Sequence, residues 1–328
     1  MPGKRSALTT AITVLSLTAA MLLIAPGPTS ARVATPQTAH AAKQAKDPRL
    51  TRRPWADPGS QAAYAAKGDK RFQVLARTPQ AVWLNEQTAP VGDATRYVRQ
   101  IVSAATRAKR TPVFVVYAIP GRDCSLHSAG GYRARTYKAW ITKVAAGLKR
   151  GKAMVMLEPD AVASLGDCAG QGDRAGLLRF AVKRLTRAGA WVYLDAGHSN
   201  WQSAPVIAKR LKRSGVAGAR GFVTNVSNFR TTASEKRFGR AVRTRLAALG
   251  IRHKRQVIDI SRNGAGPAKD AAWCNPPHAR IGAKPRVVDR GGVDALLWIK
   301  RPGESDGPCH GGPNAGAWWP QGALRLLR

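Results

Sequence analysis

Carboxylate side chains follow several short apolar segments of this sequence, each within a few residues of the end of its segment. The acids placed in this way include Asp123, Asp160, Asp195 and Asp306. Two carboxyl groups on either side of a sugar can act as proton donor and as activator of water, so such a set could hydrolyse a glycosidic bond. A carboxyl group donates a proton near neutral pH only where burial or a like charge raises its pKa. Asp160 suits that role because it follows an apolar segment close to other acids.

The apolar segments alternate with amphipathic stretches, as parallel strands covered by helices do. The predicted strands cover residues 81–84, 113–119, 153–157, 191–194, 221–226, 256–260 and 295–299. The clearest predicted helices cover residues 137–149, 174–187 and 235–249. This alternation predicts an α/β fold, either a parallel barrel or a doubly wound sheet. The carboxyl ends of parallel strands meet at one face, so either fold would gather the acids in a shared cleft.

The N-terminal residues 1–41 have the composition of a secretory signal peptide. Two basic residues precede an apolar run over residues 7–25, and small residues at candidate cleavage sites follow it. An uncleaved anchor helix is the alternative, since the run is just long enough to span a membrane. Residues 42–58 are basic and rich in proline, which predicts a linker or a loosely held arm. A single catalytic domain over residues 59–328 would follow, secreted into a space where cysteines can pair.

The chain has a large excess of positive charge, with 54 Lys and Arg against 18 Asp and Glu and a net charge of +36. Such an excess predicts attraction to anionic surfaces but does not bear on the fold. Most of these cations fall on predicted helices and the N-terminal arm, so a solvated outer face is the simplest interpretation and adhesion to anionic polymers the alternative. No nucleic-acid-binding, zinc-site or P-loop motif is present, so we expect no specific nucleic-acid partner, no metal and no other cofactor.

Six distinctive motifs follow one another along the chain. They are V-V-Y-A-I-P-G-R-D-C at 115–124, M-L-E-P-D at 156–160, Y-L-D-A-G-H-S-N-W at 193–201, V-I-D-I-S-R-N-G at 257–264, W-C-N-P-P at 273–277 and L-W-I-K-R-P-G-E-S-D-G at 297–307. Together they resemble glycoside hydrolase family 6, the inverting β-1,4-glucanases. The resemblance, from about Trp83 to Trp319, implies a distorted seven-stranded parallel β/α barrel (TIM-like) in a single domain. It also implies a secreted enzyme that cleaves β-1,4-glucosidic bonds of cellulose or a related β-glucan with inversion.

The resemblance implies roles for individual residues. It makes Asp160 the general acid, Asp123 the acid that keeps Asp160 protonated and orders the water, and Asp306 the candidate base. Pro308, inserted after Gly307, departs from the commonest pattern close to Asp306. Flat indole rings stack on the apolar faces of sugars, which suits the tryptophans in the implied set. The residues implied to bind the glucan are Tyr117, Trp83, Asp195, Trp201, Asn228, Trp273, Lys300 and Glu304.

Each of these assignments has a structural alternative. Asp160 could cap a following helix, and Asp123 could pair with Arg122. Asp195 could either support the other acids or act directly in the chemistry. Glu158 could face either the cleft or a helix, and we leave it unassigned. Residues expected to be structural include His198, Asp259 and Trp298.

Four cysteines permit three disulfide pairings, which sequence alone does not decide. The resemblance implies the sequential pairs Cys124–Cys168 and Cys274–Cys309, which would hold two loops of the cleft. Exo-acting members of the family carry longer insertions in these two spans, and both spans are short here. We therefore expect an open groove and cutting at internal bonds by a monomer, with an exo-acting cellobiohydrolase as the alternative.

A protein that binds glucan without cleaving it is a further alternative. The three residues implied to be catalytic, Asp123, Asp160 and Asp306, are all present, which argues against a loss of the chemistry.

Overall fold

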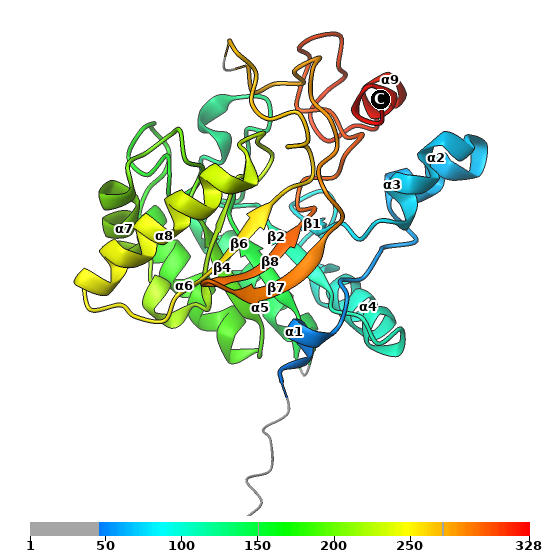
Figure 1. Cartoon of the computed structure of the whole chain (residues 1–328). Helices are drawn as coiled ribbons and strands as arrows, with labels where there is room; N and C mark the ends of the chain where they lie inside the picture. Colours follow the sequence, from blue (N-terminus) through cyan, green and yellow to red (C-terminus); the bar gives the residue numbers. More distant parts are fainter. Residues whose placement is uncertain (1–45, 150, 271) are drawn as a thin grey trace, which may run out of the picture. The chain divides into compact units, whose positions relative to one another are not determined.

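A curled, mainly parallel sheet lies at the centre of the fold, with helices around its outer side (Figure 1). The computed structural model describes residues 46–149, 151–270 and 272–328. Within these residues eight strands form one sheet in the order β1-β2-β3-β4-β5-β6-β8-β7. The strands are β1 (Val82–Leu84), β2 (Val113–Val116), β3 (Met154–Leu157), β4 (Trp191–Asp195), β5 (Gly221–Thr224), β6 (Arg255–Asp259), β7 (Arg286–Arg290) and β8 (Val293–Leu297).

The strand order decides between the two predicted folds. Each strand from β1 to β6 pairs in parallel with the next one along the chain, and β8 pairs in parallel with β6. A doubly wound sheet would instead reverse its strand order at a switch point. The Ala81 N–H also donates to the Trp298 carbonyl (2.9 Å), so the start of β1 reaches the residue after β8. The distorted parallel barrel is confirmed, and its seven predicted strands are β1 to β6 and β8.

Strand β7 is a feature that the apolar pattern does not predict. It pairs antiparallel with β8 at the edge of the sheet. Its residues, R-V-V-D-R, are exposed or half-buried, and three of the five are charged. An edge strand that faces water does not need a continuous apolar run, so its sequence carries little strand signal.

The barrel strands are buried on both faces. In β2, Val113 and Val115 lie in a cluster with the inward-facing residues of the other strands, whereas Phe114 and Val116 pack in the layer beneath the helices. Because successive side chains of a strand point to opposite faces, burial of both faces requires apolar residues at consecutive positions. This explains the nearly unbroken apolar runs in the sequence.

The helices are α1 (Pro48–Thr51), α2 (Gln61–Gly68), α3 (Gln73–Arg77), α4 (Ala94–Arg107), α5 (Ala134–Leu148), α6 (Arg174–Arg187), α7 (Ala204–Arg213), α8 (Thr232–Ala248) and α9 (Pro320–Leu326). Helices α4 to α8 connect successive strands on the outside of the barrel, whereas α1 to α3 precede β1 and α9 follows β8 (Figure 1). The three clearest helix predictions correspond to α5, α6 and α8. Helix α6 begins at the predicted residue because the Asp173 carboxylate accepts the N–H of Gly176 (2.8 Å).

Residues 46–58 do not form the loosely held arm suggested by their composition. The Arg49 side chain is buried, lies 4.2 Å above the Trp191 ring and donates to the Gly189 carbonyl (2.8 Å). The backbone of Trp55 pairs with Thr111 (2.9 Å). This stretch therefore belongs to the compact unit that ends at Arg328.

The predicted signal peptide, residues 1–41, lies outside the described residues. Among the helices that are described, none has the length and apolar character needed to cross a membrane.

Candidate active site

The carboxylate of Asp195 connects the ends of two neighbouring strands. Asp195 ends β4 and is almost completely buried, and its Oδ1 accepts the N–H groups of Asp160 and Gly197 (2.9 Å each). Asp160, three residues beyond β3, has a left-handed backbone (φ 67°), which is uncommon for a residue with a side chain. The bond to Asp195 helps to hold this conformation. Asp160 starts no helix, so the capping alternative is not what the structure shows.

The environment of Asp160 favours its protonated form. Burial raises its pKa to about 7, the negative charge of Asp123 acts in the same direction, and Arg174 opposes them. Within the described residues, no Lys or Arg forms an ion pair with Asp123, Asp160 or Asp195. These carboxyl groups therefore stay unpaired in a chain with three times as many basic residues as acidic ones.

Asp123 lies in the loop after β2, where its Oδ2 accepts the N–H of Ser128 (2.6 Å). Burial raises its pKa, against the lowering effect of that hydrogen bond and of Arg122. Arg122 itself pairs with Glu86 (2.7 Å) and lies 4.8 Å above the Tyr117 ring. The alternative in which Asp123 is the ion-pair partner of Arg122 is therefore wrong.

Tyr117 lies near these acids, and Trp83 packs against it. Their rings meet edge to face with centroids 5.3 Å apart, and Trp83 Nε1 donates to the Ile299 carbonyl (2.8 Å). Burial raises the pKa of Tyr117 well above its ordinary value, and the charges of Asp160 and Asp123 add to the effect. Tyr117 is therefore close to both acids and remains a neutral phenol.

Asp306 has the opposite electrostatic environment. Its Oδ2 accepts from Arg262 Nη1 (2.7 Å) and from the Asn275 N–H (3.0 Å), and Lys300 Nζ lies 3.4 Å from its Oδ1. Burial alone would raise its pKa, but the positive charges of Arg262 and Lys300 outweigh this effect and lower it. Asp306 is therefore held ionised. Neither Arg262 nor Asn275 belongs to the predicted set of site residues, although Arg262 follows β6 at a position where a site residue is expected.

Lys300 and Glu304 hold the loop that carries Asp306. Besides contacting Asp306, Lys300 Nζ donates to the Ser305 carbonyl (3.2 Å). The Glu304 carboxylate accepts from Gln61 Nε2 (2.8 Å) and pairs with Arg301 (3.1 Å). The contacts of Lys300 and Glu304 with other residues of the protein are thus known, whereas sugar binding by these two residues stays a prediction.

Three of the residues implied to bind glucan lie in loops beyond the strands. Trp201 and Trp273 are 40% and 44% exposed, which leaves room for stacking. Asn228 is half-buried after β5, and its Oδ1 accepts the Phe229 N–H (3.1 Å). The His198 ring packs beside Trp201 with centroids 5.7 Å apart, and burial lowers the pKa of His198 to about 4.

Buried acids behind these loops organise the backbone. Glu158 accepts the N–H groups of Ala118 and Ile119 (3.0 and 3.1 Å), and burial raises its pKa to about 7. Asp259 accepts four backbone N–H groups, from Ser227, Ser261, Ile299 and Lys300. The structural role expected of Asp259 is thus what its contacts show. The sequence signal for such structural acids is their position within or directly next to an apolar strand.

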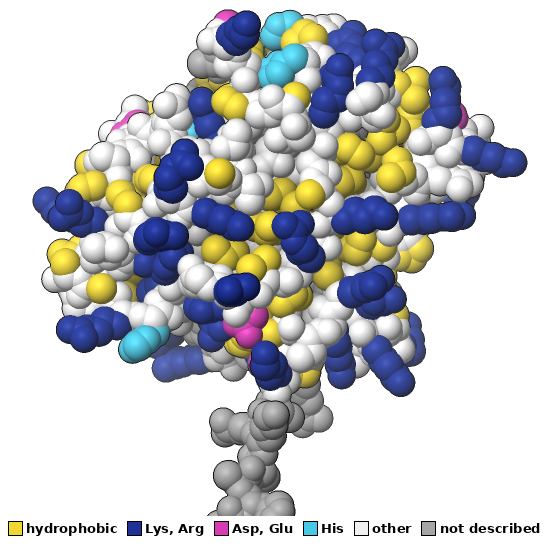
Figure 2. All heavy atoms as spheres, viewed as in Figure 1, with side chains coloured by type: hydrophobic (Ala, Val, Ile, Leu, Met, Phe, Trp, Pro, Cys, Tyr) yellow, Lys and Arg dark blue, Asp and Glu magenta, His cyan; other side chains and the backbone are white. Residues whose placement is uncertain are grey.

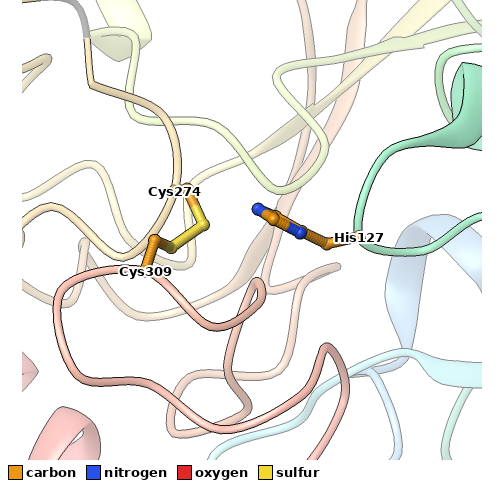
Figure 3. Close-up of side chains that lie close together, drawn as sticks. All are labelled: His127, Cys274 and Cys309. Atoms are coloured by element: carbon orange, nitrogen blue, oxygen red, sulfur yellow. A yellow bond between two sulfur atoms is a disulfide. The ribbon is translucent and has the colours of Figure 1, made fainter.

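Two disulfides join the sequential cysteine pairs, Cys124–Cys168 and Cys274–Cys309, as the resemblance implied. The side chain of His127 points toward the second disulfide (Figure 3), and its nitrogen and the two sulfurs lie within 4.8 Å of one another. Because both sulfurs are bonded to each other, they are not the thiolates that bind a metal. This cluster instead brings the loop of Asp123 against the loop of Asp306.

Comparison with known proteins identifies the family. Residues 48–328 match the model of glycosyl hydrolases family 6. The chain belongs to this family. It is 47% identical to Endoglucanase A of Cellulomonas fimi over 273 residues, which cover 82% of this chain and 59% of that protein. It is 38% identical to Endoglucanase 1 of Streptomyces halstedii over 288 residues, covering 83% and 88% of the two chains.

The chain also matches a relative that is named for another activity, and it matches a solved structure. A probable 1,4-β-D-glucan cellobiohydrolase C of Neosartorya fischeri is 31% identical over 284 residues, 72% of this chain and 62% of that protein. The endoglucanase Cel6 of Mycobacterium tuberculosis, solved with methyl-cellobiosyl-4-deoxy-4-thio-β-D-cellobioside, superposes with a TM-score of 0.80 at 42% identity. The match covers 86% of this chain and 98% of that one. The family 6 resemblance and its fold are thus confirmed.

Proposed function

We propose that this family 6 protein is a secreted, inverting endo-β-1,4-glucanase that acts on cellulose or a related β-glucan. The observation that carries the proposal is the contrast between two acids of the site. Asp160 has a pKa of about 7 and no ion-pair partner among the described residues, whereas Asp306 is held ionised by Arg262 and Lys300. An inverting hydrolase needs such a division, with one carboxyl group protonated and another group available to accept a proton.

In the proposed reaction, Asp160 donates its proton to the glycosidic oxygen as the bond to the anomeric carbon breaks. Asp123 supports this step because its negative charge helps to keep the proton on Asp160. A water molecule forms the new bond to the anomeric carbon from the opposite face and loses a proton. Asp306 accepts that proton, directly or through a second water, and the products are two shorter glucans, one with an inverted anomeric centre.

We propose that the glucan lies along the aromatic and polar residues near the acids. Tyr117 would lie beneath the sugar at the cleaved bond, since the charges of both Asp160 and Asp123 act on its hydroxyl group. The other residues of the proposed binding set are Trp83, Asp195, Trp201, Asn228, Trp273, Lys300 and Glu304.

The endo mode is supported by two observations. The relatives named endoglucanases reach 47% and 38% identity, against 31% for the relative named a cellobiohydrolase. The two disulfide-bonded spans separate their cysteines by only 44 and 35 residues. Short spans leave little chain with which to roof the groove.

Product analysis of a soluble β-1,4-glucan by NMR, together with viscometry, tests the proposal. An endo-acting inverting enzyme gives an early fall in viscosity and an α-anomer as the first product. Release of cellobiose with almost no loss of viscosity would overturn the endo mode, and a β-anomer as first product would overturn inversion.

Substitution of the proposed acid distinguishes an enzyme from a glucan-binding protein. We expect Asp160→Ala to lower the release of reducing sugar at least a hundredfold and to leave glucan binding in place, since general acid catalysis contributes about 10²–10⁴-fold. Equal activity of the variant and the wild type would overturn the assignment of Asp160.

Two further parts of the proposal have tests of their own. Analytical ultracentrifugation of the full chain tests whether the protein is a monomer. N-terminal sequencing of exported protein tests whether residues 1–41 are removed.

A further inference from the structure

Helices α7 and α8 pack side by side, and the exposed charged residues of the two helices are all basic. Residues 196–258 contain 14 Lys and Arg but one acid, Glu235, and Glu235 is fully buried. Figure 2 shows basic side chains spread over the face that includes α8, with few acidic ones between them. We define the α7–α8 surface by its exposed cations: Lys209, Lys212, Arg213, Lys236, Arg237, Arg240, Arg245 and Arg252.

These cations have no acidic partner among the described residues. None of the eight forms an ion pair with a described residue, whereas Arg71 pairs with Asp69 and Arg96 with Asp93 on other surfaces. The i,i+4 pair Lys236 and Arg240 lies along one side of α8. Like charges at this spacing destabilise a helix, so the arrangement has an energetic cost that a bound anion would relieve.

The α7–α8 surface adjoins the proposed glucan groove. Helix α7 begins at Ala204, three residues after the exposed Trp201, and α8 begins soon after the loop of Asn228. Both helices therefore start at the carboxyl-end face of the barrel, where the acids lie.

We propose that the α7–α8 surface binds an acidic polysaccharide that carries carboxylate groups. This inference rests on the proposed function, because it treats Trp201 as a sugar platform. Lys and Arg make charge-assisted hydrogen bonds to carboxylates, and a surface with several unpaired cations complements a polymer that has one carboxylate on each sugar. A polyuronate combines this charge with the sugar rings that an aromatic platform accepts, which favours it over a phosphodiester polymer.

The test compares two variants of the full chain that have the same net charge. Both are measured for binding to polygalacturonate and to duplex DNA over a range of salt concentrations, and for hydrolysis of a soluble neutral β-glucan. The surface variant carries Lys209→Gln, Lys212→Gln, Arg237→Gln and Arg240→Gln. The control variant changes four exposed cations that lie in α4, just after α4 and in α5: Arg99→Gln, Arg107→Gln, Lys109→Gln and Lys143→Gln.

We expect the surface variant to lose roughly tenfold or more in affinity for polygalacturonate at low salt, while the control variant loses much less. The difference should shrink as salt screens the charges. Equal losses in the two variants would overturn the proposal, because binding would then follow net charge alone. Selective loss of DNA binding with polygalacturonate binding retained would overturn the choice of partner. Hydrolysis of the neutral glucan should stay unchanged in both variants, so a failure of the proposed function would be seen separately.

Discussion

The His127 imidazole lies against the Trp273 indole, with ring centroids 5.8 Å apart and ring planes 36° from parallel. His127 belongs to the loop that carries Asp123, and Trp273 directly precedes the disulfide-bonded Cys274. Gly307, next to Asp306, leaves room for the imidazole, since a Cβ at this position would come within 2.5 Å of the His127 ring. This contact joins the loops of the proposed acid pair and the proposed base.

The contact between His127 and Trp273 is expected to limit access of internal glucan segments. An aromatic pair is worth about 0.5–1.5 kcal/mol, so His127→Ala should favour parted loops by roughly two- to tenfold. For His127→Ala we therefore expect a larger fall in the viscosity of a soluble glucan per reducing end formed than for the wild type. His127→Phe keeps an aromatic ring and serves as the control. An unchanged ratio in His127→Ala would show that the contact does not govern access.

The charge of Asp123 should set the alkaline limit of activity. Asp160 must be protonated to act as the acid, so activity should decline as the pH rises through its pKa of about 7. Asp123→Asn removes a negative charge that raises this pKa, and the decline should therefore begin at lower pH. The position of the alkaline limb in kcat/KM profiles measures the effect, whatever the loss in rate. A limb that stays in place would rule out the proposed coupling.

Arg262 should set the acid limit of activity through Asp306. Its guanidinium helps to lower the pKa of Asp306, so Arg262→Met should raise that pKa and move the acid limb to higher pH. Loss of one partner of a buried ion pair costs about 3–5 kcal/mol, so the unfolding free energy should fall as well. Arg262→Lys retains a positive charge and should keep the limb closer to wild type. If the limb is the same in all three proteins, Asp306 is not the group that must be ionised.

Glu235 is expected to act as a positioning residue for the loop that holds Trp201. Glu235 lies in helix α8 and is buried, and its Oε1 accepts the N–H of Ser199 in the loop after β4 (2.9 Å). A hydrogen bond to a charged group contributes about 1.5–3 kcal/mol, so Glu235→Leu should raise KM for cellohexaose roughly tenfold or more. Glu235→Gln keeps an acceptor and should restore most of the affinity. A fall in kcat of Glu235→Leu with no change in KM would contradict this role.

Glu158 should make stability fall with rising pH. Its pKa is about 7 in the folded protein, against an ordinary value of 4.5 that applies when it is unfolded. The folded state therefore binds more protons between these values, and about 3 kcal/mol of stability should be lost as the pH rises through this window. Chemical denaturation at pH 5 and pH 8 should show a smaller difference for Glu158→Gln than for the wild type. Equal differences would mean that Glu158 does not titrate there.

The sequence by itself determined the strands of the barrel and the places of its acids. A strand buried on both faces must be apolar at successive positions, so β1 to β6 and β8 can be read from local composition. The edge strand β7 has no such constraint and was missed. The packing of Arg49 and Trp55 onto the barrel was missed for a similar reason, because a basic, proline-rich stretch shows no partner until the chain is folded.

Only the tertiary structure decided which acids hold a proton. Asp160 and Asp306 are both aspartates that follow barrel strands, and their local sequence does not show which charged groups reach each of them. The separation comes from burial and from charges that the fold brings together: burial and the distant Asp123 act on Asp160, whereas the distant Arg262 and the nearby Lys300 act on Asp306. Electrostatic interactions depend on distance and burial in space, so they are settled only when the fold brings these groups together.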